Sequence, residues 1–337
     1  MSINKKILAL TGALIVGAMG IVFSENFISK KPDPRLGKPL VDMGDVIGVD
    51  TIIVTKGAES LKLVTDGNNV WKLSDTEGFP ADATKISRLI DDLTRTNVQV
   101  LASTSKEPSS EFGLSDATVI VLQKAGKESL NLKLAKNREY GGQFIAFDND
   151  HKVYLISQSI PVEIAAASWE LKNLVNIPSN LVKKVAFASA GKKKAILSRG
   201  KPEDPIKLEK LAPQEKESSS IRSHESILTG LTFSERLASD HADYKKAIAA
   251  PSTVPSTVTV TLFDGRNYNV KIISTSGDKK KYFIEINAQN GASTSETDSK
   301  ELETLNNMMK QNVFEVSSQM AERFQKGLDD MVEKKGS

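Results

Sequence analysis

The chain opens with a run of apolar residues that no charged residue interrupts. The run extends from Ile7 to Phe23, and Lys5 and Lys6 directly precede it. As a helix, these 17 residues would be about 25 Å long, near the lower limit for crossing a bilayer. Basic residues at the start of such a segment favour a cytoplasmic N-terminus. The pattern therefore predicts a membrane anchor over residues 1–28, with the bulk of the chain outside the cytoplasm.

A cleaved signal peptide is the alternative interpretation of this segment. Ala18 and Gly20 are small residues of the kind that precede a cleavage site. Residues 21–23 continue the apolar run beyond that site, which favours the retained anchor. The prolines and glycine that follow are typical of an extended spacer, and they predict a linker over residues 29–45.

Hydrophobic residues begin to alternate with polar ones near Val46. Turn signals at Lys56-Gly57 and Asp66-Gly67-Asn68 separate the first short runs, which indicates a β-meander with one buried face. Further strands are expected at residues 118–122, 130–134, 143–147 and 153–157.

Two helices are predicted beside these strands. Ile86, Leu89, Ile90 and Leu93 share one helical face, and Asp82 is placed to cap this helix. A second helix is expected from Pro161 to Asn173. It closes a first domain that covers residues 46–178.

Residues 179–337 repeat the order of the first domain and form a second, diverged domain. Phe283-Ile284 aligns with Phe144-Ile145, and a helical pattern at Leu302, Leu305 and Met309 lies within an insertion. Chance similarity between two segments of strands and a helix is the alternative. The predicted fold class is α+β, with an N-terminal transmembrane helix followed by two tandem, duplicated, mostly antiparallel sheet-plus-helix units.

The charge balance and the lack of cysteine exclude some classes of function. The chain has 45 basic and 42 acidic residues, whereas a nucleic-acid binder normally shows a concentrated basic surplus. The lysine clusters at 192–194 and 279–281 each lie near a glycine in an expected hairpin turn, and they are interpreted as solvated turn charges. The absence of cysteine excludes disulfides and thiolate chemistry. Nucleic acid is therefore not expected as a partner.

No catalytic signature is found in the sequence. The motifs of serine hydrolases, zinc proteases, phosphate-binding loops and dinucleotide folds are missing. The three histidines are interpreted as an exposed turn residue (His151), a packing residue on a helix face (His224) and a solvated residue (His241). Asp91 and Asp92 point about 100° apart on a helix, which indicates a solvated face. Tyr140-Gly141-Gly142 indicates a tight turn. We expect no enzyme and no catalytic, cofactor-binding or metal-binding residues.

Several short motifs together resemble a known family. They are Trp71-x-Leu73, Phe79-Pro80-Ala81-Asp82, Phe112-Gly113-Leu114, Tyr140 to Ile145, Val153-Tyr154-Leu155, and Trp169 with Lys172-Asn173-Leu174. This order resembles an uncharacterised bacterial family, number 4340 among the domains of unknown function, over residues 46–189. The resemblance implies one N-terminal membrane helix and, for some members, an association with auxiliary subunits of ABC-type exporters similar to the gliding-motility system. It supplies no catalytic residues, since none is established for the family.

The sequence as a whole favours a single-pass protein of the bacterial inner membrane with a binding or scaffolding domain in the periplasm. Its expected partners are the membrane and an unidentified protein, which the resemblance suggests is an ABC transporter subunit. Two alternatives remain open. One is an extracytoplasmic hydrolase with a carboxylate site between the two copies, and the other is a secreted binding protein released by signal cleavage.

Overall fold

The computed structural model describes most of the chain beyond the N-terminal segment. The described residues are 32–65, 70–76, 78–105, 110–136, 142–148, 150–189, 191–249, 255–277 and 279–335. The predicted anchor at residues 1–28 and the first part of the predicted linker lie outside them. Within the described residues, no helix combines the length and the apolar character that crossing a membrane requires.

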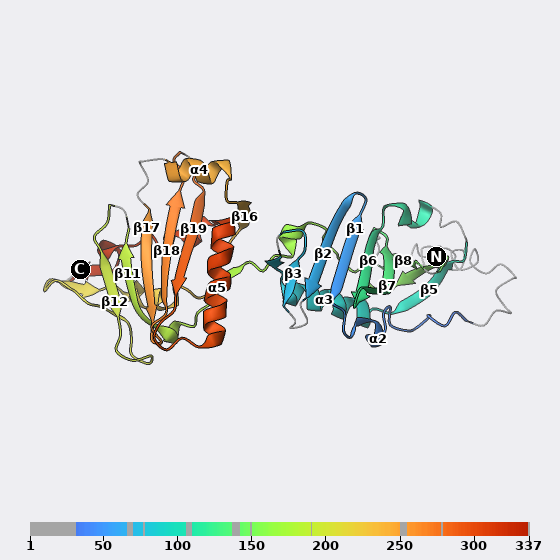
Figure 1. The fold of residues 1–337 in the computed structure, drawn as a ribbon, viewed down its shortest axis with the longest axis horizontal. Coiled ribbons are helices and arrows are strands. Elements are labelled where there is room, and N and C mark those ends of the chain that lie inside the picture. Colours follow the sequence, from blue (N-terminus) through green and yellow to red (C-terminus); the bar gives the residue numbers. More distant parts are fainter. Residues whose placement is uncertain are drawn as a thin grey trace, which may run out of the picture. The chain divides into compact units, whose positions relative to one another are not determined.

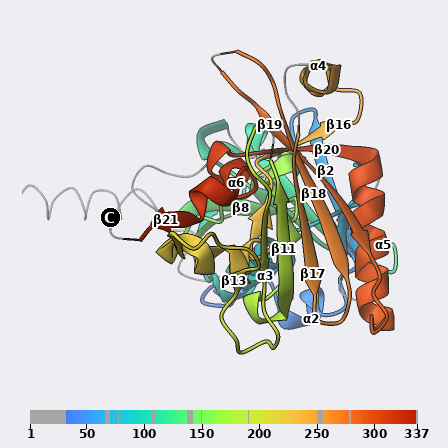
Figure 2. The same cartoon turned by 90° about the vertical axis from the view of Figure 1, so that its left-hand side faces the viewer.

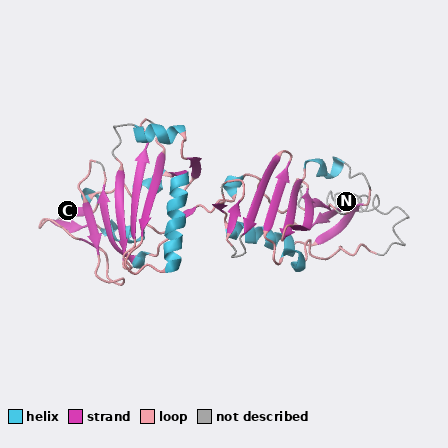
Figure 3. Ribbon diagram, viewed as in Figure 1, coloured by secondary structure: helices cyan, strands magenta, loops and turns pink. Residues whose placement is uncertain are grey.

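The chain divides into two compact units. The first takes its described residues from 32–65 and 84–164, and the second from 70–83 and 165–335. Strands predominate in both units, as Figure 3 shows. The predicted domain limits at 46–178 and 179–337 were drawn from a sequence repeat and stay a prediction.

The first large sheet has nine strands, in the order β4-β3-β2-β1-β6-β7-β8-β9-β5. Its paired strands run antiparallel. The strands are β1 (Thr51–Lys56), β2 (Glu59–Thr65), β3 (Trp71–Leu73), β4 (Phe79–Pro80), β5 (Val98–Ser103), β6 (Thr118–Lys124), β7 (Lys127–Leu134), β8 (Gln143–Phe147) and β9 (Val153–Ile156).

Alternation of burial explains why these residues form strands with one buried face. On β1, Ile52 and Val54 are fully buried, while the residues between them are only partly covered. The long helix of this unit is α3 (Ala83–Arg95), and Ile86, Leu89 and Leu93 are its buried side chains. The predicted helix at this place is therefore confirmed.

The second large sheet has eight strands, in the order β13-β12-β11-β17-β18-β19-β20-β16 (Figure 1). Its strands are β11 (Val182–Ala188), β12 (Ala195–Ser198), β13 (Lys207–Leu208), β16 (Glu235–Ala238), β17 (Ser256–Leu262), β18 (Asn267–Ser274), β19 (Tyr282–Gln289) and β20 (Asn312–Val316). Helix α5 (Glu296–Gln311) joins β19 to β20 and packs against both. Its buried residues, Leu302 and Leu305, belong to the helical pattern seen in the sequence.

The remaining elements are short. Two small sheets pair β10 (Asn173–Val175) with β15 (Leu231–Thr232), and β14 (Glu215–Glu217) with β21 (Val332–Lys334). The short helices are α2 (Met43–Val46), α4 (Ala242–Ala249), α6 (Ser318–Glu322), η2 (Ser110–Phe112), η3 (Leu114–Asp116), η4 (Ala166–Ser168), η5 (Ser179–Leu181), η6 (Ser219–Ser226) and η7 (Leu328–Asp330).

The two large sheets follow the same path through the chain. The order β13-β12-β11-β17-β18-β19-β20-β16 corresponds strand by strand to β3-β2-β1-β6-β7-β8-β9-β5. In both sheets the strand at the far edge, β5 or β16, precedes the four-strand run in sequence. Helix α5 interrupts the second sheet at the point where a short turn joins β8 to β9 in the first.

The predicted α+β class of sheet-plus-helix units is wrong for the described residues, and the predicted transmembrane helix lies outside them. Four sheets, whose paired strands run antiparallel, dominate the fold, and helices are few. The helix expected at 161–173 is replaced by η4 and the start of β10, because Trp169 and Leu171 make backbone hydrogen bonds with Asp82 and Pro80. The counterpart of α3 in the second unit is only η6, in which serines predominate and compete for backbone hydrogen bonds.

Candidate functional site

A hollow of about 630 Å³ lies in the first unit, between the segment at 34–45 and strands β5, β7 and β8. Its walls carry charges of both signs. The cationic residues are Arg35 and Lys38, and the acidic ones are Asp42, Asp45, Glu128 and Asp148. A ligand in this hollow would therefore meet hydrogen-bond donors and acceptors together.

A buried polar network fastens the start of the described chain to the sheet beside this hollow. The Asp33 carboxylate accepts hydrogen bonds from Lys152 Nζ at 2.8 Å and Tyr154 Oη at 3.3 Å. Burial alone would raise the pKa of Asp33, but these hydrogen bonds and that of the Arg35 N–H hold it below its usual value. The single hydroxyl proton of Tyr154 is shared with Asp150, whose carboxylate lies nearer, at 2.9 Å. The network positions Arg35, whose guanidinium lies 3.8 Å from the Phe147 ring centroid.

One acceptor in the hollow has no partner among the described residues. Asn131 Oδ1 is buried and accepts no hydrogen bond there, while Asn131 Nδ2 donates weakly to Glu128 at 3.4 Å. Buried polar atoms are nearly always satisfied in folded proteins.

Helix α2 lines the hollow through Asp45, and α2 and Ile47, the residue that follows it, each expose a large apolar side chain. Met43 and Ile47 are 60% and 67% exposed. The helix is held to the sheet by its backbone, since Gly44 O accepts from Lys124 Nζ and Asp45 O accepts from Ser129 Oγ at 3.1 Å. These contacts leave both apolar side chains free to meet a partner.

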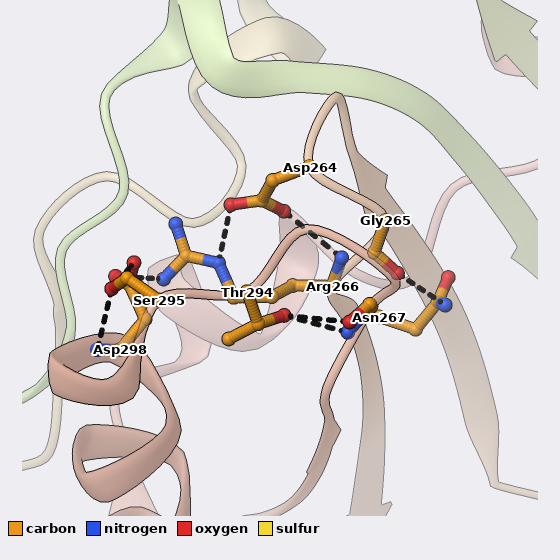
Figure 4. Close-up of polar contacts among 8 residues, drawn as sticks. Asp264, Gly265, Arg266, Asn267, Thr294, Ser295 and Asp298 are labelled. Atoms are coloured by element: carbon orange, nitrogen blue, oxygen red, sulfur yellow. Dashed lines mark hydrogen bonds and ion pairs between the residues drawn. The ribbon is translucent and has the colours of Figure 1, made fainter.

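A second polar cluster joins the β17–β18 hairpin to the start of α5 (Figure 4). Arg266 is 5% exposed, and its Nε lies 2.7 Å from Asp264 and its Nη1 2.5 Å from Asp298. Ser295 caps α5 by accepting from the Asp298 N–H. The hydrogen bond from Ser295 Oγ, together with Arg266, holds the pKa of Asp298 below its usual value. Because every carboxylate here is paired with a cation or a hydroxyl, we assign this cluster a structural role.

Gly291 allows this hairpin to approach the α5 loop. A Cβ atom on Gly291 would lie 2.1 Å from Gly265 C and 2.5 Å from Arg266 N. We expect Gly291→Ala to lower the free energy of unfolding by about 2 kcal/mol, because backbone atoms cannot yield to a new methyl group. Urea unfolding of the full chain measures the change, with Ala292→Gly as the neighbouring control. An unchanged midpoint for Gly291→Ala would contradict the close approach.

A third cluster surrounds Glu170 in the second unit. The Glu170 side chain is 3% exposed, and its carboxylate lies 2.6 Å from Arg236 Nε and 2.7 Å from Lys172 Nζ. Both cations also lie over aromatic rings, Arg236 over Phe79 and Lys172 over Phe233. The cluster stabilises the packing of residues from three separate segments.

The histidines occupy three different environments. His151 is exposed between β8 and β9. His224 is 8% exposed and packs edge-on against the Phe187 ring at 5.2 Å between centroids. Burial, with Lys326 nearby, lowers the pKa of His224 to about 4. His241 Nδ1 accepts from the Asp243 N–H at 3.3 Å, just before α4.

The other residues that the sequence singled out are not brought together. Asp91 pairs with Arg95 at 3.4 Å on the exposed side of α3. Tyr140 and Gly141 lie outside the described residues, whereas Gly142 has a φ of 73° and lies close to Ile156 O. No group of three or more His, Asp or Glu side chains in the described part of the chain could hold a metal ion. The predictions of no enzyme and of no catalytic, cofactor or metal residues stay predictions.

Sequence reasoning missed all three charged clusters. Their members are ordinary charged residues that lie far apart in the chain, for example Asp33 and Lys152 or Glu170 and Arg236. The only local signal was Lys172, which was noted near Trp169 for the family resemblance. Charge pairing across a fold leaves no periodic trace in one sequence.

Comparison with known protein families gives a match to one family. The family described as "Domain of unknown function (DUF4340)" matches residues 71–249, which is more than half of the 337 residues. The chain belongs to the DUF4340 family. The match begins at β3 and ends with α4, so it starts later and extends further than the resemblance at 46–189. Neither the curated proteins nor the solved structures include a match to this DUF4340 member.

Proposed function

We propose that this DUF4340 protein is a binding or scaffolding module that works outside the bacterial cytoplasm, at the inner membrane, as an auxiliary component of an ABC-type transport system. The observation that carries the binding role is the exposed pair Met43 and Ile47 beside the charged hollow of the first unit. Exposed apolar anchors surrounded by a polar rim are typical of protein-binding surfaces. The apolar segment at 7–23 supports the proposed location.

The proposed partner is a protein rather than a small molecule. Methionine adapts its shape to a partner surface, and two side chains one helical turn apart can enter one apolar groove. Arg35 and Lys38 with Asp42 and Asp45 supply charges of both signs at the rim. Such rim charges select a partner of complementary charge more than they add affinity. The association with transporter subunits rests on the family resemblance.

Replacement of both apolar anchors tests the binding role. We expect Met43→Ser/Ile47→Ser to lose most of the protein recovered with the full chain after cross-linking in cells and gentle detergent extraction, because each lost anchor removes apolar burial of about 1–3 kcal/mol. Val100→Ser is the matched control, since Val100 is also exposed (45%) but lies on β5. Equal recovery from both variants would place the partner elsewhere. Recovery of the unmodified chain without any partner would contradict the binding function itself.

A protease test addresses location separately. We expect protease added to spheroplasts, but not to intact cells, to degrade the full-length chain. Resistance in spheroplasts together with degradation after lysis would place the chain in the cytoplasm and contradict the proposed location.

A further inference from the structure

One end of the second unit collects lysines from two segments that are far apart in the sequence. Helix α4 lies at the end of the sheet where the hairpin between β18 and β19 turns (Figures 1 and 2). Ala247 fixes α4 there by packing with Ile273, Phe283 and Val313 in one buried cluster. The arrangement brings Lys245 and Lys246 of α4 to the same end as the lysines at 279–281.

A hollow of about 340 Å³ lies between α4 and the hairpin. Its lining consists of Asp243, Lys246, Thr275, Ser276, Lys279 and Lys281. Three ammonium groups and two hydroxyls can all donate hydrogen bonds into this space, and among the described residues that line it Asp243 is the one carboxylate.

That carboxylate is already neutralised within the fold. Asp243 Oδ2 lies 3.0 Å from Lys281 Nζ, and Lys281 also lies 3.5 Å from Glu315. The hydrogen bond from Lys281 holds the pKa of Asp243 below its usual value, so Asp243 stays charged and paired with Lys281 at neutral pH. Lys246 and Lys279 are exposed, and neither forms an ion pair with any carboxylate of the described residues. The hollow therefore offers a ligand two ammonium groups, those of Lys246 and Lys279, that form no ion pair among the described residues.

We propose that this hollow binds the phosphate group of a phosphorylated ligand. Phosphate offers several acceptor oxygens with high charge, which suits two lysines and two hydroxyls better than a carboxylate would. The interpretation of Lys279–Lys281 as solvated turn charges considered the hairpin alone. In the folded chain, Lys246 and Asp243 of α4 lie beside this hairpin, and together they line a hollow with several hydrogen-bond donors.

The phosphate has two possible sources, and one experiment separates them. The full chain is titrated with inorganic pyrophosphate in one arm. In the other it is mixed with phosphatidylcholine vesicles that contain or lack phosphatidylglycerol. Binding of pyrophosphate indicates a soluble ligand, and vesicle binding that requires phosphatidylglycerol indicates a lipid headgroup. Because exposed charges are screened by salt, binding in either arm is expected to weaken as salt increases.

Matched charge variants show whether the hollow is responsible. We expect Lys246→Gln/Lys279→Gln to weaken binding by about tenfold or more, since two charge-assisted hydrogen bonds are lost. Lys56→Gln/Lys127→Gln removes the same net charge from exposed hairpin turns of the first unit and should bind normally. If the double variant does not fold by circular dichroism, Lys279→Gln alone replaces it. Absence of binding in both arms, or an equal loss in the two double variants, would overturn the proposal.

Discussion

Glu170→Ala is expected to lower the free energy of unfolding by about 3 kcal/mol. The Glu170 side chain is almost fully buried, and its removal leaves Arg236, which is 19% exposed, without its carboxylate beside the Phe79 ring. Removing one partner of a buried ion pair costs about 3–5 kcal/mol, because the remaining charge stays desolvated. We place the effect at the lower end, since Lys172 is 35% exposed and can be hydrated. Urea unfolding of the full chain, followed by the fluorescence of Trp71 and Trp169, measures the change.

Two controls separate the buried charge from the loss of a side chain. Glu170→Met/Arg236→Met removes both charges and should cost about 1 kcal/mol or less. Glu209→Ala breaks the exposed pair with Lys184 and should cost about 0.5 kcal/mol. A double variant as unstable as Glu170→Ala would show that side-chain packing, and not the unpaired Arg236, explains the loss.

Acidification from pH 6.5 to pH 4 is expected to remove about 3 kcal/mol of stability through His224 alone. The folded chain lowers the pKa of His224 from 6.5 to about 4, mainly because the ring is buried, with a further contribution from Lys326. Below pH 6.5 the unfolded chain therefore binds a proton that the folded chain does not. The stabilisation is complete above pH 6.5 and declines as the pH falls toward 4.

His224→Leu tests this assignment. It removes the titrating group but keeps an apolar side chain against Phe187. Between pH 6.5 and pH 4 we expect the urea midpoint of the variant to fall much less than that of the unmodified chain. His151→Gln, at an exposed position, should retain the full pH dependence. An identical slope for His224→Leu and the unmodified chain would assign the acid sensitivity to other groups.

Helices and strands were predicted correctly where a local pattern of hydrophobic residues is enough to specify them. The period of Ile86, Leu89 and Leu93 identified α3, and the predicted strand at 143–147 coincides with β8. Prediction failed where tertiary pairing overrode the local pattern. The backbone near Trp169 is extended and makes hydrogen bonds with Pro80 and Asp82, where a helix had been predicted. The edge strand β5 was not predicted.

The charged sites lay beyond sequence reasoning for a related reason. Glu170 and Arg236 are 66 residues apart, and Arg266 and Asp298 are 32 apart. Nothing in either local segment distinguishes these residues from solvated surface charges. Their burial exists only after strands and loops from separate segments have packed.

The sequence by itself determined the apolar N-terminal run, the lack of thiol chemistry, the alternation that produces the central strands, and membership of the DUF4340 family. The tertiary structure alone decided which strands lie side by side in the two large sheets and the convergence of Lys246 with Lys279. The physical reason is the distance along the sequence between the residues that interact. Side-chain periodicity acts over a few residues and is visible in the sequence, whereas strand pairing and charge burial depend on contacts between distant segments.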